Sequence, residues 1–151
     1  MTLTNSVLPG RARASDWLDE DSTWELSLGL AGYLRAVAKR IGVPAEGTTF
    51  EISDTATAYL ALTRRSPAWP ARDLMLVWSE RTGWIVSVET EPHEAPVVIA
   101  CFGGTDPLPA PDAVARFVAE ALTGDGAAVA RVTTRIDTNR VRLAKDLAHY
   151  I

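Results

Sequence analysis

The titratable residue that the sequence places nearest to an apolar interior is Asp54. It lies within TTFEISDTATAYLALT, residues 48–63, and shares its parity with apolar residues from Phe50 to Leu62. In one continuous strand its carboxylate would point into the apolar side, where burial raises a carboxyl pKa and favours acid–base chemistry. If residues 53–55 form a turn, the carboxylate is solvated. Asp and Ser bond readily to neighbouring backbone, so we favour the turn, with Asp54 as the one catalytic candidate.

Potential metal ligands gather once in the chain, in the stretch 89–96. They are Glu89, Glu91, His93 and Glu94, with Pro92 and Pro96 among them. Alternating ligands on an extended segment could share one side and hold a cation. The two prolines instead indicate a solvent loop, so we predict no metal site.

No cofactor site is predicted either. Gly103 and Gly104 follow an apolar run, but neither a dinucleotide-binding nor a phosphate-loop pattern accompanies them. Three prolines (Pro107, Pro109 and Pro111) then remove backbone donors that an anion would need. No nucleophile elbow occurs, so no nucleophilic catalysis is indicated.

The chain holds five Trp residues, which is many for its length. Trp78 and Trp84 flank a predicted hairpin turn, where cross-strand aromatic pairs stabilise sheets. Together with Tyr59 and Trp69 they are the candidate binding residues. We favour packing within the sheet for them, and the hot spot of an interface or a pocket for a flat ligand remain as alternatives.

Composition and charge exclude several classes of protein. The 151 residues, 47% hydrophobic and 23% charged, fit one soluble globular domain. The net charge of −4 argues against nucleic-acid binding, although residues 131–151 carry +3 and residues 1–25 carry −3. Two solvated ends are the simpler interpretation of these charges, and a basic tail meeting a nucleic acid or an acidic partner is the other.

Cysteine content and hydropathy indicate a cytoplasmic protein. Cys101 is the single cysteine, so no intramolecular disulfide forms, and its apolar run VVIACF predicts a buried, inert thiol. The N-terminal residues lack the apolar core of a secretory signal, and no window of 18 residues is apolar enough to span a membrane.

Helices are predicted at both ends of the chain. Residues 1–21 show no sustained period and are expected to form a flexible arm. Ser22 and Glu25 form a capping box, so a helix is expected over residues 23–41, ended by Gly42 and Pro44. A second helix starts at Pro111 and stops at Gly124. A third is expected after Asp137-Thr138, burying one side. That side holds Val141, Ala144, Leu147, Ala148 and Ile151.

Between the helices the pattern is that of strands. Residues 48–63 form one strand or, with the turn, two. Residues 74–79 and 84–89 form a hairpin, with Gly83 in the left-handed position of its turn. Residues 97–102 are apolar on both parities, so both faces of that strand should be covered.

These elements predict an α+β fold. We expect an antiparallel meander of three to four strands, with an N-terminal helix and C-terminal helices packed on it. The expected organisation is an arm over residues 1–21, a single domain over 22–124 and a basic, helical segment over 125–151.

Three segments together resemble a family of small actinobacterial proteins known as a domain of unknown function. They are GYLRAVAKRIGV, SDTATAYLALTRRSPAWPARDLMLVWSERTGWIVSVET and GGTDPLPAPDAVARFVAEAL, within residues 30–123. Thirteen Arg against two Lys agree with a GC-rich genome. The order of elements is also similar to secretion-chaperone-like α+β proteins, which bind other proteins as dimers. The resemblance implies no catalytic residue.

Two functional hypotheses follow. The first is a non-enzymatic cytoplasmic module, chaperone-like or adaptor-like, that recognises another protein and forms a homodimer. The second is a small enzyme or small-molecule-binding protein, with a pocket around Asp54 between sheet and helices. Nucleic-acid binding through the C-terminal arginines is a distant third.

Overall fold

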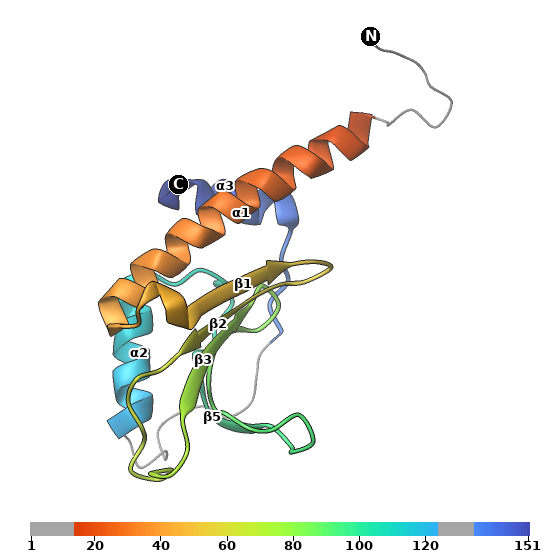
Figure 1. Ribbon diagram of the computed structural model, residues 1–151. Coiled ribbons are helices and arrows are strands. Elements are labelled where there is room, and N and C mark those ends of the chain that lie inside the picture. Colours follow the sequence, from red (N-terminus) through yellow and green to blue (C-terminus); the bar gives the residue numbers. More distant parts are fainter. Residues whose placement is uncertain (1–13, 124–134) are drawn as a thin grey trace.

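The computed structural model describes residues 14–123 and 135–151, with the side chains of 14–22 left out of the description (Figure 1). Within the described residues the chain forms a five-stranded antiparallel sheet. In sequence, one α-helix precedes the strands and two α-helices follow them. The fold is therefore α+β, as the order of elements predicts. The strands are β1 (Thr48–Ile52), β2 (Ala56–Ala61), β3 (Leu74–Ser79), β4 (Gly83–Val88) and β5 (Val97–Cys101). The helices are α1 (Ala14–Ile41), α2 (Pro111–Thr123) and α3 (Arg140–Leu147), with 3-10 turns η1 (Ala45–Gly47) and η2 (Ala148–Tyr150).

The sheet is an up-and-down meander in the order β1-β2-β3-β4-β5, with every neighbouring pair antiparallel. The expected meander is confirmed, but the expected count of three to four strands is wrong. Residues 48–63 contain two strands because Ser53–Thr55 turn the chain, so that Ile52 lies opposite Ala56. The Ser53 hydroxyl donates a hydrogen bond to the Thr55 carbonyl, which stabilises that turn.

Alternate strand residues and the helices share one hydrophobic core. Leu60, Leu76 and Val86 lie side by side across β2, β3 and β4 and are fully buried, together with the inward residues of α1, α2 and α3. Residues of the opposite parity, such as Thr57, Tyr59 and Ile85, are exposed or half-buried. Period-2 burial along the strands thus separates a core face from an outer face of the sheet.

The first helix begins at Ala14, nine residues before the predicted start. Residues 14–21, which the sequence analysis assigns to the arm, are helical, and residues 1–13 lie outside the described residues. The capping box at Ser22 is a local signal, and extending an existing helix requires fewer ordered dihedrals per hydrogen bond than starting one.

The C-terminal helix is shorter than predicted, and it buries a different side. It starts at Arg140 after Asn139, whose side chain accepts a hydrogen bond from the Arg142 N–H. Leu143, Ala144 and Leu147 are buried, whereas Val141 and Ile151 are 69% and 65% exposed, so the predicted side is wrong at both ends. Residues 125–134 of the expected basic segment 125–151 lie outside the described residues.

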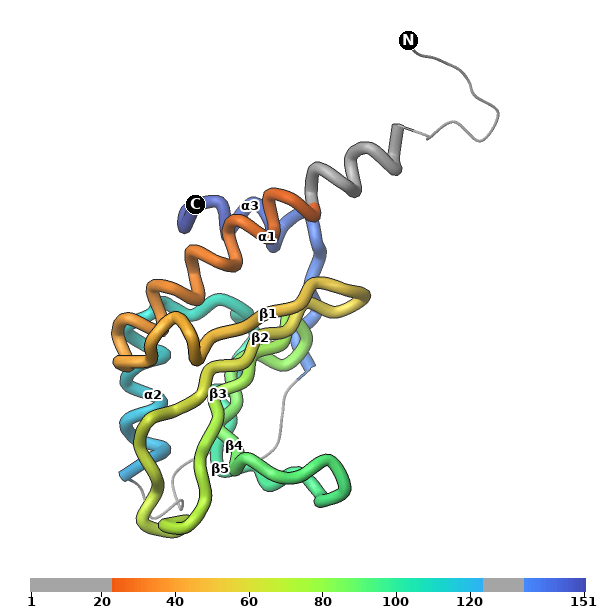
Figure 2. The backbone as a smooth tube through the Cα atoms, viewed as in Figure 1, coloured from red at the N-terminus to blue at the C-terminus, as the bar shows by residue number. Residues whose placement is uncertain are grey.

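Two glycines of α1 explain how α3 and η2 pack against it. A Cβ at Gly29 would lie 2.7 Å from Leu147 Cβ, and a Cβ at Gly32 would overlap the carbonyl oxygen of Tyr150. The C-terminal backbone therefore approaches α1 at a distance that only glycine permits. Figure 2 shows α3 running beside α1.

At the β5 edge of the sheet the pairing is irregular. The register between β4 and β5 shifts at Val86 and Ser87, which is the geometry of a bulge. Ala100 and Cys101 are both buried, whereas Val97, Val98 and Ile99 are half-buried. The prediction that both faces of this strand are covered therefore holds only for its last two residues.

Candidate docking groove

Asp54 lies in the turn between β1 and β2 and is exposed. The turn interpretation of residues 53–55 is confirmed, and the carboxylate does not point into the core. Acid–base chemistry was predicted at Asp54 because its carboxylate would be buried. The side chain is exposed, so the structure gives no such reason for chemistry there.

The two hairpin tryptophans pack in the core. Trp78 and Trp84 lie opposite each other on β3 and β4, with ring centroids 6.4 Å apart, and both are fully buried. The Trp78 indole donates to the Pro107 carbonyl at 2.6 Å, and the Trp84 indole donates to the Tyr33 hydroxyl at 3.0 Å. Their packing within the sheet is confirmed, and neither ring is available on a surface for a ligand or partner.

Tyr59 and Trp69 do not join them. Tyr59 lies on the outer face, where its hydroxyl donates to Glu89 Oε1 at 2.9 Å. Burial, with the hydrogen bond to Glu89 as the next cause, raises the pKa of Tyr59 to about 12. Trp69 is 37% exposed in the connection between β2 and β3. The four predicted binding residues are therefore spread over the core, the outer face and a loop.

One carboxylate that is buried in the structure was not identified from the sequence. Glu80, at the end of β3, is only 4% exposed and accepts hydrogen bonds from Ala56 N at 3.1 Å and from Arg140 Nε at 3.1 Å. The Arg140 guanidinium also donates to the Ser53 carbonyl. Glu80 shares the parity of Leu74, Leu76 and Trp78, which is the signal that could have revealed it. Its oxygens are occupied by α3 and β2, so it joins elements and faces no open site.

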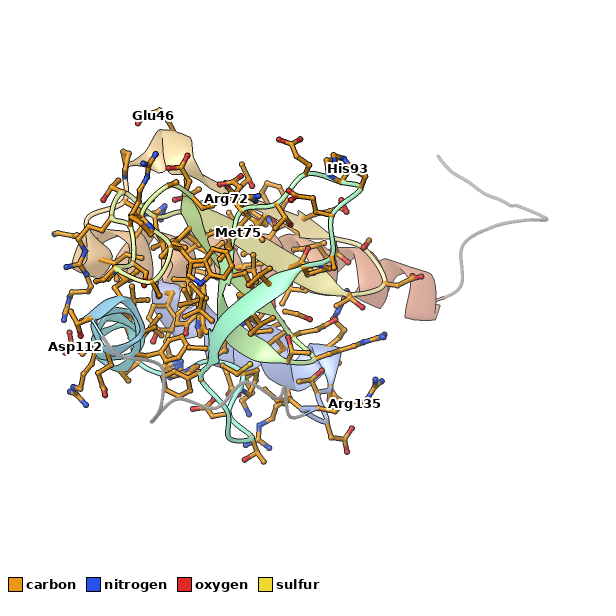
Figure 3. The ribbon with its side chains drawn as sticks, turned by 90° about the horizontal axis from the view of Figure 1, so that it is seen from below. Glu46, Arg72, Met75, His93, Asp112 and Arg135 are labelled. Atoms are coloured by element: carbon orange, nitrogen blue, oxygen red, sulfur yellow. The ribbon has the colours of Figure 1, made fainter. Side chains whose placement is uncertain are left out.

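The stretch after β4 behaves as a solvent loop. Glu94 pairs with Arg72 at 3.1 Å, and the guanidinium beside it lowers the pKa of Glu94. His93 lies at the outer end of the same connection (Figure 3). Among residues 14–123 and 135–151, no three potential ligands are placed to hold a metal ion. Cys101 is buried, and burial raises the pKa of its thiol.

An apolar groove lies between α1 and β1. We call it the α1–β1 groove; its volume is about 430 Å³. Its lining residues are Ala31, Leu34, Arg35, Ala38, Lys39, Val43, Ala45, Thr48 and Phe50. Phe50 projects from β1 on the core-face parity yet is 38% exposed, because it lies at the end of the sheet. The groove therefore presents an aromatic ring that is partly open to water beside small apolar residues.

β1 forms the edge of the sheet beside this groove, and the direction of its backbone groups follows from its neighbour. Ala56 in β2 donates its N–H to Glu80 and accepts from the Glu80 N–H, so its backbone groups face β3. Opposite residues of an antiparallel pair exchange both hydrogen bonds or neither. Ile52, opposite Ala56, therefore directs its N–H and C=O away from β2, and by alternation Phe50 and Thr48 do the same. The Thr48 N–H is taken by the Ala45 carbonyl.

An apolar strip on α1 leads into the groove. Trp24 is 66% exposed and Leu28 is 39% exposed. Spacings of four and three residues continue from them to Ala31, Arg35 and Ala38, so all five lie along one side of the helix. Fourteen helical positions extend about 21 Å, which is the length of a strand of about six residues.

Two cations lie at the rim of the groove. Arg35 and Lys39 are exposed, and within the described residues neither has an ion-pair partner. Their neighbour Arg40 instead pairs with Asp112 at the start of α2. The groove is thus apolar within and positively charged at its border.

Comparison with known protein families finds a match for the segment that contains the five strands. Residues 33–120 match a family of unknown function, DUF6292. The chain belongs to this family. The DUF6292 segment begins at Tyr33 and includes all five strands, the proline-rich connection after β5 and most of the α1–β1 groove. No curated protein and no solved structure matches the chain. None of the helices in the described part of this DUF6292 protein has the length and apolarity that crossing a bilayer requires.

Proposed function

We propose that this protein is a non-enzymatic protein-interaction module that binds an extended polypeptide segment as an additional strand along β1. The observation that carries the proposal is the position of β1, which pairs on one side only among the residues that the structure describes, directly beside the α1–β1 groove. Strand addition uses backbone hydrogen bonds for affinity and pockets under alternate side chains for specificity. Here Phe50 and Ile52 would supply the outward backbone groups, and the groove would receive the apolar side chains.

The lack of protection on this edge supports the proposal. Natural proteins cover or interrupt free edges with proline, inward charges or bulges. The opposite edge has such devices, since a register shift accompanies β5 and Pro96 directly precedes it. β1 reads TTFEI, with β-branched and aromatic residues and without proline or lysine. An edge of this composition is stable in water when something covers it.

A binding role without catalysis is supported by the buried polar groups. The buried carboxylate of Glu80 is neutralised by Arg140, and the buried hydroxyl of Tyr33 is held between Trp84 and Pro109. Recognition through backbone groups tolerates many partner sequences, which suits a chaperone-like or adaptor-like role in the cytoplasm.

A displayed library of random peptides tests the proposal directly. We expect enrichment of segments with alternating apolar residues, and at least tenfold weaker binding to a Phe50→Pro variant. Proline at this position removes an N–H that points away from β2, so it leaves the β1–β2 hydrogen bonds in place. Val141→Lys, which removes another exposed apolar side chain, is the matched control and should bind like the parent. Peptides that bind the Phe50→Pro variant equally well would contradict the proposal.

A further inference from the structure

We infer that the strand that occupies β1 is β1 of a second copy of this chain, so that two copies join their sheets about a twofold axis at Phe50. This inference rests on the proposed function, because it names the partner of the same edge. Its basis is the self-complementary placement of backbone groups and side chains along Thr48–Ile52.

The backbone groups of β1 match those of an antiparallel copy. The outward-facing residues are Thr48, Phe50 and Ile52, symmetric about the central Phe50. With the axis at Phe50, the two Phe50 residues exchange both of their hydrogen bonds. The Ile52 N–H of each copy then meets the Thr48 carbonyl of the other. The Thr48 N–H is donated to the Ala45 carbonyl within its own copy, so the Ile52 carbonyl of the other copy receives no hydrogen bond from it.

The side chains fit the same register. The rings of Phe50 and Phe50 of the second copy become a cross-strand aromatic pair on the core face. Ile52 of the second copy lies opposite Thr48, which lines the α1–β1 groove, so its side chain enters the groove of the first copy. Glu51 lies opposite Thr49, so no two acidic residues of β1 face each other on the outer face.

A second copy also explains why one edge is protected and the other is not. Twofold pairing uses the same surface on both subunits and closes after two copies. The bulge beside β5 keeps the remaining edges of such a dimer from adding further strands. The exposed strip that leads from Trp24 and Leu28 to the groove lies beside the axis and adds apolar area. A stable interface buries about 800 Å² per partner, more than one short strand provides.

Solution mass is the first test. We expect the full chain to sediment at twice its 16.3 kDa at micromolar concentration. Phe50→Pro and Phe50→Lys should each raise the dissociation constant of the dimer at least tenfold, whereas Val141→Lys should leave it unchanged. Near-ultraviolet circular dichroism of the buried Trp78–Trp84 pair verifies that each variant is folded. A dimer that persists in the folded Phe50 variants overturns the inference.

Oxidation tests the register. Opposite residues on paired antiparallel strands have Cα atoms about 4.5–5.5 Å apart, within the range that a disulfide spans. The double variant Thr49→Cys with Glu51→Cys should therefore form covalent dimers, because Cys at these positions would meet across the axis. Each single variant should remain largely non-covalent. Equal cross-linking of the single and double variants overturns the register and with it the inference.

The two proposals fail in different ways. A chain that remains monomeric up to about 100 μM, yet binds library peptides in a manner that Phe50→Pro abolishes, overturns the second copy as partner and leaves strand addition intact. A monomeric chain that also selects no peptide at this edge overturns both.

Discussion

Trp84 donates its indole N–H to the hydroxyl oxygen of Tyr33, 51 positions earlier in the chain, at 3.0 Å. The Tyr33 hydroxyl in turn donates a hydrogen bond to the Pro109 carbonyl oxygen at 2.5 Å. Tyr33 and Trp84 are both fully buried. One phenol thus joins α1, β4 and the proline-rich connection that leads to α2, and its burial raises the pKa of Tyr33 well above the usual range.

Replacing Tyr33 with Phe should destabilise the fold substantially. The substitution leaves the Trp84 indole and the Pro109 carbonyl without partners in the core, at a cost of about 1–3 kcal/mol for each buried group. Urea unfolding measures the loss. Tyr59→Phe is the matched control, because its hydroxyl bonds to an exposed carboxylate, and it should cost less than about 1 kcal/mol. Equal losses for the two variants would show that the buried chain of hydrogen bonds adds no stability.

Gly32→Ala should also destabilise the protein, although alanine favours helix formation by about 1 kcal/mol over glycine. The added methyl group overlaps the carbonyl of Tyr150, a backbone atom that cannot move without displacing η2. Hydrogen exchange should therefore become faster in α3 and η2. Ser27→Ala, on the same helix, serves as the control and should not raise exchange there. A gain in stability for Gly32→Ala would contradict the close approach of the Tyr150 carbonyl to Gly32.

Glu80→Gln tests the ion pair that joins β3 to α3. An amide keeps an acceptor for the Ala56 N–H but removes the charge opposite Arg140, whose side chain is 34% exposed. Because hydrogen bonds to charged groups contribute about 1.5–3 kcal/mol, we expect a loss of about that size in the free energy of unfolding. The matched change Asp146→Asn breaks the exposed pair with Arg142 and should cost under about 1 kcal/mol. Comparable losses in the two variants would contradict the role of Glu80.

The protein should lose stability in alkali through its tyrosines. Tyr59 titrates near 12 when folded and at 10.0 in its ordinary state, so the folded chain holds this proton more tightly. Its contribution is complete below pH 10 and disappears as the pH rises toward 12. Absorbance of tyrosinate should therefore appear later in the folded protein than in urea, and Tyr59→Phe should remove part of that delay. Coincident titration of folded and unfolded chains would contradict this.

The sequence alone determined which segments become helices and strands, because each signal is local. Gly42 and Gly83 adopt the positive φ angles that their turns require, Pro111 opens α2, and Val114, Val118, Ala121 and Leu122 give the period of a helix with one buried side. The meander follows from the short connections between strands. The cross-strand pair of Trp78 and Trp84 follows from their positions on either side of a turn.

The tertiary structure alone decided which surface is available for binding. Burial of Glu80 depends on Arg140, sixty positions later, and the open edge beside Phe50 depends on where α1 crosses the sheet. Such relationships join residues far apart in sequence, and no local period records them. The buried side of α3 was predicted wrongly for the same reason, since packing of α3 against α1 overrides a local stripe.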